Sequence, residues 1–407
     1  MVSISTSKYG QKWLDNFDHY DRIVASTLID NLMLVSASEF ASKINAKLMA
    51  MASQADQNNQ VIAFYAEREI DKENGTVKAI FPNSENGRAL GDGVPPVQVD
   101  AVKQDVGSEG IVATFITKLC KANQSRCLPH PGPNLLRKQK VKKIIIVTDF
   151  IGSGRRLYDM MDAFSKVASI NSWRSYKCIS FEVVCYSATE SGLKWVESHS
   201  LKPIVHVHVA CPTIDESFEG QKLGAIKQLC KKYPKKARYS FGFGHTGSLI
   251  VFSHGIPNNA PAILYNSAGG WNPLFEGRSA IGADIDDISD PADRLVANSE
   301  KVLKIRNARK LLKNSESELW LGSVLIMDAI KKGLRTTTRL SGRTQIPLSQ
   351  VETVLALALE AKWLTPRNTL TALGRRELRW SKWLKPQDEA IASQNDMFYF
   401  PTQLRAP

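Results

Sequence analysis

Residues 141–164 decide how the whole chain is interpreted, and they read VKKIIIVTDFIGSGRRLYDMMDAF. Residues 144–147 form an unbroken β-branched run, which is typical of a strand buried on both faces. A turn containing two glycines follows, and apolar residues then recur at helical spacing, so a helix is expected to begin near Arg155 or Arg156. A strand, a tight turn and a helix N-terminus direct free backbone N–H groups at one point. The sequence therefore predicts an anion site that begins at Gly152.

This turn resembles the ribose-phosphate signature of type I phosphoribosyltransferases. In that signature an apolar strand precedes two acids, two apolar residues, a small residue, Thr-Gly, a variable residue and Thr. Asp149 stands at the second acid, Thr148 replaces the first acid, and Arg156 replaces the final hydroxyl. The resemblance implies that Asp149 holds a ribose hydroxyl, with Thr148 as the other catalytic position. The residues that it assigns to a 5′-phosphate are Gly152, Ser153, Gly154, Arg155 and Arg156.

Two other phosphate-binding loops are excluded by the same residues. No Gly-Lys-Ser/Thr follows the glycines, so this is not a nucleotide-triphosphate loop, and the six-residue dinucleotide glycine pattern is absent. The alternative is an ordinary strand-to-helix turn that binds nothing.

Length and composition describe a globular chain. The 407 residues suffice for about two or three domains, and hydrophobic content of 43% with 23% charge is ordinary. No apolar run approaches the length of a membrane helix, and residues 1–11 lack the pattern of a secretory signal. The six cysteines are scattered without a close C-x-x-C pair. We therefore expect reduced thiols in a cytoplasmic protein, with no disulfide framework, zinc site or membrane partner.

The positive charge is concentrated near the end of the chain. The net charge is +13, and residues 301–380 hold sixteen Lys or Arg against six Asp or Glu, a net of +10. A basic terminal segment favours a nucleic-acid partner. The alternative is a solvated basic surface.

The first 130 residues predict a helical cap and the start of an α/β domain. Residues 12–54 carry apolar residues at helical spacing, so we expect a helical N-terminal cap over residues 1–55. Residues 61–65 (VIAFY) form the first convincing strand. In the resembled fold, the loop after an early strand holds diphosphate, and Arg68 with Glu69 is the candidate here. The alternative is a surface salt-bridge cluster. Residues 71–106 are expected to form a loop.

Strands and helices alternate from residue 140 onward. Residues 181–186 and 204–210 are expected strands, and residues 190–198 an expected helix. This alternation favours an α/β fold with a doubly wound parallel sheet, here of type I phosphoribosyltransferase type over residues 56–277. Ligands bind beyond the carboxyl ends of such strands, where Asp149 would lie. A basic run, residues 137–143, precedes the central strand and can add positive potential to a phosphate site; the alternative is the ordinary flanking of a buried strand by lysines. Histidines alternate on the strand 204–210 without a third ligand nearby, so we assign no metal site.

A second informative stretch, residues 241–271, reads FGFGHTGSLIVFSHGIPNNAPAILYNSAGGW. Its apolar strand precedes His254, Asn258 and Asn259, which are candidates for reading a nucleobase edge. Aromatic side chains that can stack on the base are Phe241, Phe243 and Trp271. The alternative is a turn built on Asx hydrogen bonds.

The order of these motifs resembles the phosphoribosyltransferase-like proteins of bacterial conflict and anti-phage defence systems. The segments that carry this likeness are WLDNFD, the GSEG helix start, TDFIGSGR and HGIPNNAPAILY. Some members of that group occur in retrons, so the resemblance implies a reverse transcriptase and its RNA–DNA product as candidate partners.

The C-terminal part predicts a small DNA-binding module. Residues 278–310 are expected to form a linker and helix, and residues 311–407 a winged helix-turn-helix domain with a C-terminal tail. The expected recognition helix, residues 349–362, offers no arginine for base contacts. Candidate phosphate contacts are Arg335, Arg339, Arg343 and Arg367. A winged helix that contacts protein is the alternative.

Together these features predict a phosphoribosyltransferase-like effector that binds phosphoribosyl diphosphate or a nucleotide and acts on nucleotide metabolism. The resemblance implies Mg2+ bridging diphosphate and ribose hydroxyls, and a reaction in which a nucleophile attacks the ribose C1. The rival hypothesis is a catalytically inactive, nucleotide-sensing DNA-binding regulator, because Thr148 replaces an acid.

Overall fold

The structure is a computed structural model that describes residues 4–85, 88–94, 108–233, 239–267, 270–280, 291–303, 308–312 and 315–383. The chain divides into two compact units, Met1–Asp290 and Pro291–Pro407, and each is described by itself. No helix in these ranges is long and apolar enough to cross a membrane.

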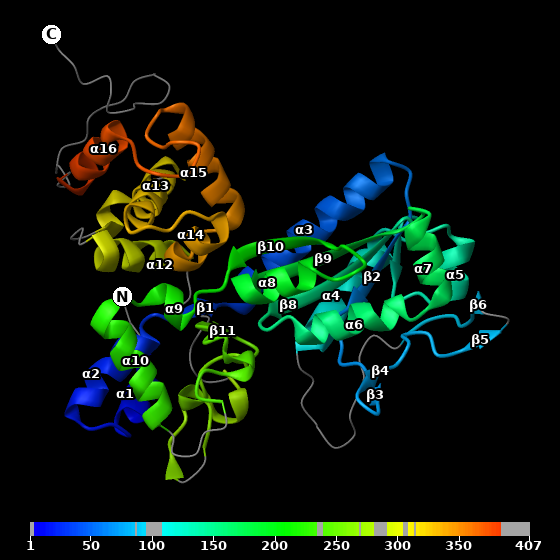
Figure 1. Ribbon diagram of the computed structural model, residues 1–407, viewed down its shortest axis with the longest axis horizontal. Coiled ribbons are helices and arrows are strands. Elements are labelled where there is room, and N and C mark those ends of the chain that lie inside the picture. Colours follow the sequence, from blue (N-terminus) through cyan, green and yellow to red (C-terminus); the bar gives the residue numbers. More distant parts are fainter. Residues whose placement is uncertain are drawn as a thin grey trace. The chain divides into compact units, whose positions relative to one another are not determined.

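A five-stranded sheet forms the centre of the first unit, with strand order β10-β9-β8-β2-β7 and every pair parallel (Figure 1). The strands are β2 (Ile62–Ala66), β7 (Cys127–Pro129), β8 (Lys143–Ile151), β9 (Ser180–Ala188) and β10 (Ile204–Ala210). Because all five run in one direction, their carboxyl ends meet at one edge of the sheet. Residues that directly follow β2 and β8 therefore lie close together.

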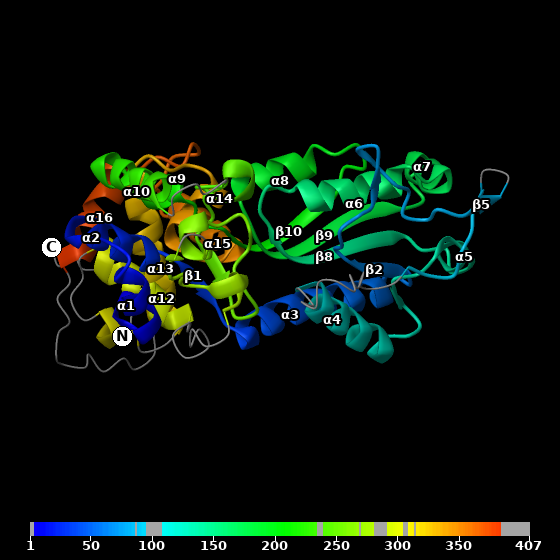
Figure 2. The same ribbon diagram turned by 90° about the horizontal axis from the view of Figure 1, so that it is seen from below.

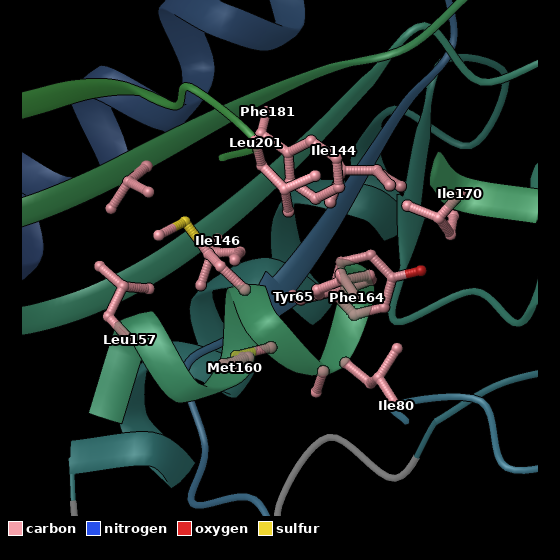
Figure 3. Packing of buried hydrophobic residues seen from close by; sticks show 14 of the residues in the cluster. Tyr65, Ile80, Ile144, Ile146, Leu157, Met160, Phe164, Ile170, Phe181 and Leu201 are labelled. Carbon is pink, nitrogen blue, oxygen red and sulfur yellow. The ribbon is translucent and has the colours of Figure 1, made fainter. Parts of the chain in front are cut away.

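The central strand β8 is buried on both faces, as its sequence predicts. Ile144 and Ile146 belong to one core, which is covered by α6 (Arg155–Ser165), α7 (Ala168–Ser175) and α8 (Glu190–Glu197). Figure 3 shows Ile146 facing Leu157 and Met160 of α6. The intervening residues of β8 face a second core, covered by α3 (Ala37–Gln57) and α4 (Ser108–Ala122) (Figure 2). The predicted doubly wound α/β fold is confirmed.

The prediction of helices throughout residues 12–54 is wrong at one place. The helices α1 (Lys8–Leu14), α2 (His19–Ile29) and α3 are interrupted by a strand, β1 (Met33–Val35). β1 pairs in parallel with β11 (Ile250–Phe252), so the strand expected near residue 250 lies in a small second sheet rather than in the central one. The leucines before and within β1 continue the helical spacing of α2, which concealed the strand.

A further core contains residues from the beginning and from the end of the first unit's sequence. Residues of α1 and α2 pack with α9 (Ile214–Ser217), α10 (Gly220–Lys232) and the segment 249–280. Trp13 is fully buried there, and its Nε1–H donates to the Ile263 carbonyl at 3.1 Å. The segment 249–280 includes short 3-10 turns at Ala262–Leu264 and Glu276–Arg278, and another turn at Phe243–His245 precedes it. The expected cap is therefore not one structural unit. Its helices α1 and α2 and part of β1 pack in this core, whereas α3 packs in the sheet core.

The remaining elements of the first unit are short. The helix α5 (Pro133–Lys138) precedes β8, and the stretch expected to be a loop contains two hairpins. Their strands are β3 (Lys72–Glu73), β4 (Thr76–Val77), β5 (Ser84–Glu85) and β6 (Arg88–Ala89). Residues 86–87 and 95–106 of that stretch lie outside the described residues. All six cysteines are free thiols.

The second unit has the helix order of a winged helix-turn-helix. Its helices are α12 (Pro291–Asn298), a π-helical turn (Ser299–Leu303), a 3-10 turn (Ala308–Leu311), α13 (Ser315–Lys331), α14 (Thr337–Thr344), α15 (Leu348–Glu360) and α16 (Ala372–Trp383). A bridge between Leu364 and Leu370 closes the short wing. Leu321, Leu340 and Val351 are fully buried at the centre of the unit. Part of the expected linker, residues 281–290, lies outside the described residues.

Candidate functional site

A cavity of about 430 Å³ opens at the carboxyl edge of the central sheet. One wall is formed by Asp149, near the end of β8, and by the turn between β8 and α6. The other wall comes from the segments 243–259 and 277–279, where Ile256 belongs to the core that also holds α1 and α2 and Phe252 belongs to the sheet core. The cavity is therefore assembled from two cores of the same unit. It includes the three candidates named for reading a base, His254, Asn258 and Asn259, although the sequence did not show how their segment packs on the sheet.

The turn from β8 to α6 is held in shape by close contacts. A Cβ on Gly152 would lie 2.0 Å from Oδ1 of Asn259, so only glycine fits against that buried amide. On the other side, the Thr189 hydroxyl donates to the Gly152 carbonyl at 2.6 Å. Gly154 caps α6 with φ of 75°, a left-handed conformation that glycine adopts without a Cβ penalty. The first N–H groups of α6 therefore reach the cavity on a fixed backbone, which suits an anion.

Asp149 forms a pair with His254 inside the cavity. Oδ2 of Asp149 is 3.1 Å from Nε2 of His254, and both side chains line the wall. The imidazole is stacked on Phe252, with ring centroids 4.9 Å apart and planes 18° from parallel. Burial raises the pKa of Asp149, but the hydrogen bond from His254 and the positive charges nearby outweigh burial, so the pKa lies below its ordinary value. Asp149 is therefore a carboxylate at neutral pH.

Thr148 lies against a second carboxylate that sequence reasoning missed. Its hydroxyl donates to Oε2 of Glu67 at 2.6 Å, and Glu67 is only 5% exposed. Glu67 directly follows β2, and its N–H donates to the Val147 carbonyl at 2.8 Å, which continues the parallel pairing with β8. The position where Thr148 replaces an acid thus has a buried acid beside it in space. No local pattern indicates this, because the two residues are 81 positions apart.

Arg156 joins Glu67 to a third carboxylate. Its guanidinium forms ion pairs of 3.0 Å with Oε2 of Glu67 and 3.0 Å with Oε1 of Glu109, near the start of α4. The charge of Glu67 is the main reason that the pKa of Arg156 is raised above its usual value. Burial raises the pKa of Glu109, although Arg156 opposes this. Arg156 lines the predicted phosphate turn, and its charge is shared with two acids.

The other predicted residues divide between the cavity and its surroundings. Asn258 and Phe243 line the cavity, whereas Phe241 and Trp271 pack in the core with α1 and α2, so neither can stack on a ligand there. The amide nitrogen of Asn259 donates to the Phe243 carbonyl at 2.8 Å, which fixes this wall.

The diphosphate candidates lie beside the cavity rather than in it. Neither Arg68 nor Glu69 belongs to the described lining, although Glu67 does. Arg68 is half-buried near Asp71 and Glu109, and burial lowers the pKa of its guanidinium. Arg278, by contrast, lines the cavity although the sequence placed it in a linker.

The winged-helix arginines have different surroundings. The Arg335 guanidinium donates to the Ile330 carbonyl and, at 3.0 Å, to the Leu334 carbonyl, so it caps the end of α13. Arg339 on α14 and Arg367 in the wing are exposed and accessible to a phosphate backbone. Arg343 is half-buried.

A parallel sheet with an acid and a glycine-containing strand-to-helix turn at its carboxyl edge, followed by a winged helix, defines a phosphoribosyltransferase-like class of protein. Comparison with protein families agrees: residues 11–276 match the family described as PRTase-CE, and residues 324–406 match the family described as wHTH-PRTase associated. The first match covers more than half of the chain, so the protein belongs to the PRTase-CE family. No curated protein and no solved structure matches the chain.

Proposed function

We propose that the cavity binds a ribose 5′-phosphate ligand, either phosphoribosyl diphosphate or a nucleotide, for an effector that acts on nucleotide metabolism. The observation that carries this proposal is the combination, in one cavity, of the fixed turn from Gly152 to Arg156 with the ionised Asp149. A helix N-terminus favours the phosphate, and a carboxylate accepts hydrogen bonds from sugar hydroxyls.

The two carboxylates have separable roles in this proposal. Asp149 accepts from a ribose hydroxyl, while His254 holds its carboxylate in place. Glu67 uses Oε2 for Thr148 and Arg156, and its Oε1 makes no hydrogen bond with a described residue, so it is the second candidate acceptor. Arg155 and Arg278 add positive charge at the rim.

The residues present fit Mg2+ only together with a ligand. The described residues contain no cluster of three metal-ligating side chains. Mg2+ is commonly held by one or two carboxylates plus substrate phosphates, and Asp149 and Glu67 are hard oxygen donors of that type. When bound, Mg2+ would neutralise charge on a diphosphate; the protein's own part is to orient the ribose.

If the ligand is phosphoribosyl diphosphate, the reaction is attack of a nucleophile at the ribose C1 as the C1–O bond to diphosphate breaks. The ribose then carries developing positive charge, and the electron pair of the broken bond leaves with diphosphate. The carboxylates of Asp149 and Glu67 stabilise that charge by position alone. The nucleophile approaches from the wall that holds His254 and Asn258.

Calorimetric titration of the full chain with phosphoribosyl diphosphate and Mg2+ tests this function. We expect saturable binding that Asp149→Asn weakens at least tenfold, because one ligand-facing charge is lost. Asp56→Asn is the matched control, since Asp56 is an exposed acid at the far end of α3. Equal binding by the two variants would refute the proposed site.

A catalytically inactive nucleotide sensor is the second candidate, and the replacement of an acid by Thr148 favours it. Product analysis with a panel of bases separates the two. Steady diphosphate release supports the enzyme, and binding without release supports the sensor.

The resemblance to defence proteins supports a biological role as an anti-phage effector, with a retron reverse transcriptase and its RNA–DNA product as proposed partners. Cells that carry the system with Asp149→Asn are expected to lose phage resistance, whereas cells with Asp56→Asn keep it. Equal resistance would refute a role for the cavity in defence.

A further inference from the structure

A second surface with its own chemistry lies at the amino edge of the sheet. The helices α5 and α7 lie at the end of the sheet away from β1 and β11 (Figures 1 and 2). The run 137–143 therefore cannot add potential to the phosphate turn, because it precedes β8 and the turn follows it, about 25 Å further along the nine-residue strand. The prediction of added potential at the phosphate site is therefore wrong, and the run is an ordinary basic flank of a buried strand. We call this surface the amino-edge patch; it comprises Arg137, Lys138, Lys140, Lys142, Trp173, Arg174, Tyr176 and Lys177.

The amino-edge patch carries six cations, and one acid from outside its own segments, Asp92, reaches α5, where its Oδ1 accepts from the Asn134 amide at 3.4 Å. Residues 133–143 and 163–181 contain no Asp or Glu. The nearest strand acid, Glu182, is already bound to Lys143 at 2.8 Å and to His206 at 2.7 Å. None of the six cations of the patch forms an ion pair with an acid in the described ranges. Burial and the neighbouring charge of Arg88 lower the pKa of Arg137, as expected in a cluster of like charges.

Aromatic rings are interleaved with these cations. Tyr176 is 80% exposed, far more than most tyrosines of the chain, and it lies between Arg174 and Lys177. The guanidinium of Arg137 lies over the Trp173 ring, 5.6 Å from its centroid. Trp173, Lys140 and Lys142 line a cavity of about 280 Å³ whose floor is apolar. Such a recess admits a flat ring and surrounds it with cations.

We propose that the amino-edge patch binds single-stranded nucleic acid, with phosphates along the lysines and bases stacked on Tyr176 and in the Trp173 recess. Exposed aromatic rings among closely spaced cations are the combination that binds single strands without sequence preference. A duplex keeps its bases stacked and unavailable to such a recess. An anionic membrane surface needs only the lysines for binding, so it would not account for the aromatic recess. RNA and single-stranded DNA share this chemistry.

Binding of fluorescent 20-nucleotide poly(U) and poly(dT) to the full chain, measured by anisotropy at several salt concentrations, tests the proposal. The double substitution Lys140→Glu with Lys142→Glu is expected to weaken binding at least tenfold. It should also make the slope of log affinity against log salt about 1.4 shallower, because two phosphate contacts are lost. The matched control is Lys8→Glu with Lys12→Glu, which reverses two exposed lysines on α1. If the Lys140/Lys142 substitutions weaken binding of poly(U) more than binding of poly(dT), the ligand is RNA; if they weaken binding of poly(dT) more, the ligand is single-stranded DNA.

Stacking is tested separately at Tyr176. Tyr176→Ala is expected to weaken binding about tenfold, and Tyr176→Phe to preserve it, since the ring and not the hydroxyl stacks. Equal losses in the Lys140/Lys142 and Lys8/Lys12 variants would overturn the proposal, as would an unchanged Tyr176→Ala. Loss of binding to phosphatidylserine vesicles with unchanged oligonucleotide binding in the Lys140/Lys142 variant would assign the patch to membranes and also overturn it.

Discussion

Replacing Thr148 by Asp restores the acid that the phosphoribosyltransferase signature has at this position, and we expect it to damage the protein. The Thr148 hydroxyl lies 2.6 Å from Oε2 of Glu67 and 3.3 Å from Oδ1 of Asp149. A carboxylate in its place would meet two others within hydrogen-bonding distance. Because carboxylates this close cannot all remain ionised, one of them must take up a proton.

The size of the effect follows from these distances. Two unit charges about 3 Å apart repel by about 5 kcal/mol at an effective dielectric constant of about 20. Arg156, 3.0 Å from Glu67, offsets part of this, and relaxation or protonation offsets more. We therefore expect Thr148→Asp to lower the free energy of unfolding of the first unit by about 3 kcal/mol at pH 7. The loss should shrink as the pH falls towards 4, since the folded state then gains the proton that relieves the repulsion.

Thermal unfolding followed by circular dichroism, with the phosphoribosyl diphosphate titration on the same samples, measures both consequences. A unit of this size should lose roughly 6–12 °C in Tm. Adding Glu67→Gln to Thr148→Asp removes one of the charges and should restore most of the stability, so the double-mutant cycle should give a coupling of about 2 kcal/mol. If Thr148→Asp alone were as stable as the natural protein and bound the ligand more tightly, the view that Glu67 occupies the role of the missing acid would be wrong.

Three more variants test other parts of the structure. Gly152→Ala puts a methyl group against Asn259, so ligand binding should fall more than tenfold with about 1–3 kcal/mol of destabilisation; unchanged binding would contradict the fixed turn. Glu182→Gln removes a carboxyl whose pKa is lowered from 4.5 to about 2, mainly by the hydrogen bond with His206. Urea unfolding should show a loss of about 3 kcal/mol at pH 7 that disappears as the pH falls from about 4.5 towards 2, and a pH-independent loss would refute the assignment. Arg339→Ala with Arg367→Ala should weaken duplex DNA binding and make its salt slope about 1.8 shallower; an unaltered slope would favour a protein partner for the winged helix.

The central strand and its turn could be predicted because their signals are local. The run 144–147 is buried on both faces, and α6 begins at Arg155, within the expected range. The strand β1 could not be found in the same way, because its three residues extend a helical pattern and its partner lies more than 200 positions away. The pairing with β11, rather than any local preference, makes it a strand.

The candidate site shows the same division. Asp149 lies near the end of one strand and the phosphate turn follows that strand, so both could be identified from it. Glu67 and His254 approach Asp149 only through strand register and the packing of the second core, so no spacing in the sequence joins them. Arg68 and Glu69 were the candidates for holding diphosphate after the first strand, whereas the structure places their neighbour Glu67 in the cavity.

The burial of Trp13 against Ile263 has a consequence for how the cavity is assembled. No atom of residues 4–30 lines the cavity, yet those residues pack in the core that includes Ile256, beside His254 and Asn258 in the same wall. A ligand bound between that wall and the sheet would stabilise the wall and the core behind it. Ligand binding would therefore also stabilise α1 and α2 against local unfolding. Although these helices do not contact the ligand, the rate at which a protease cleaves them would fall as the cavity fills, and this rate would report ligand binding.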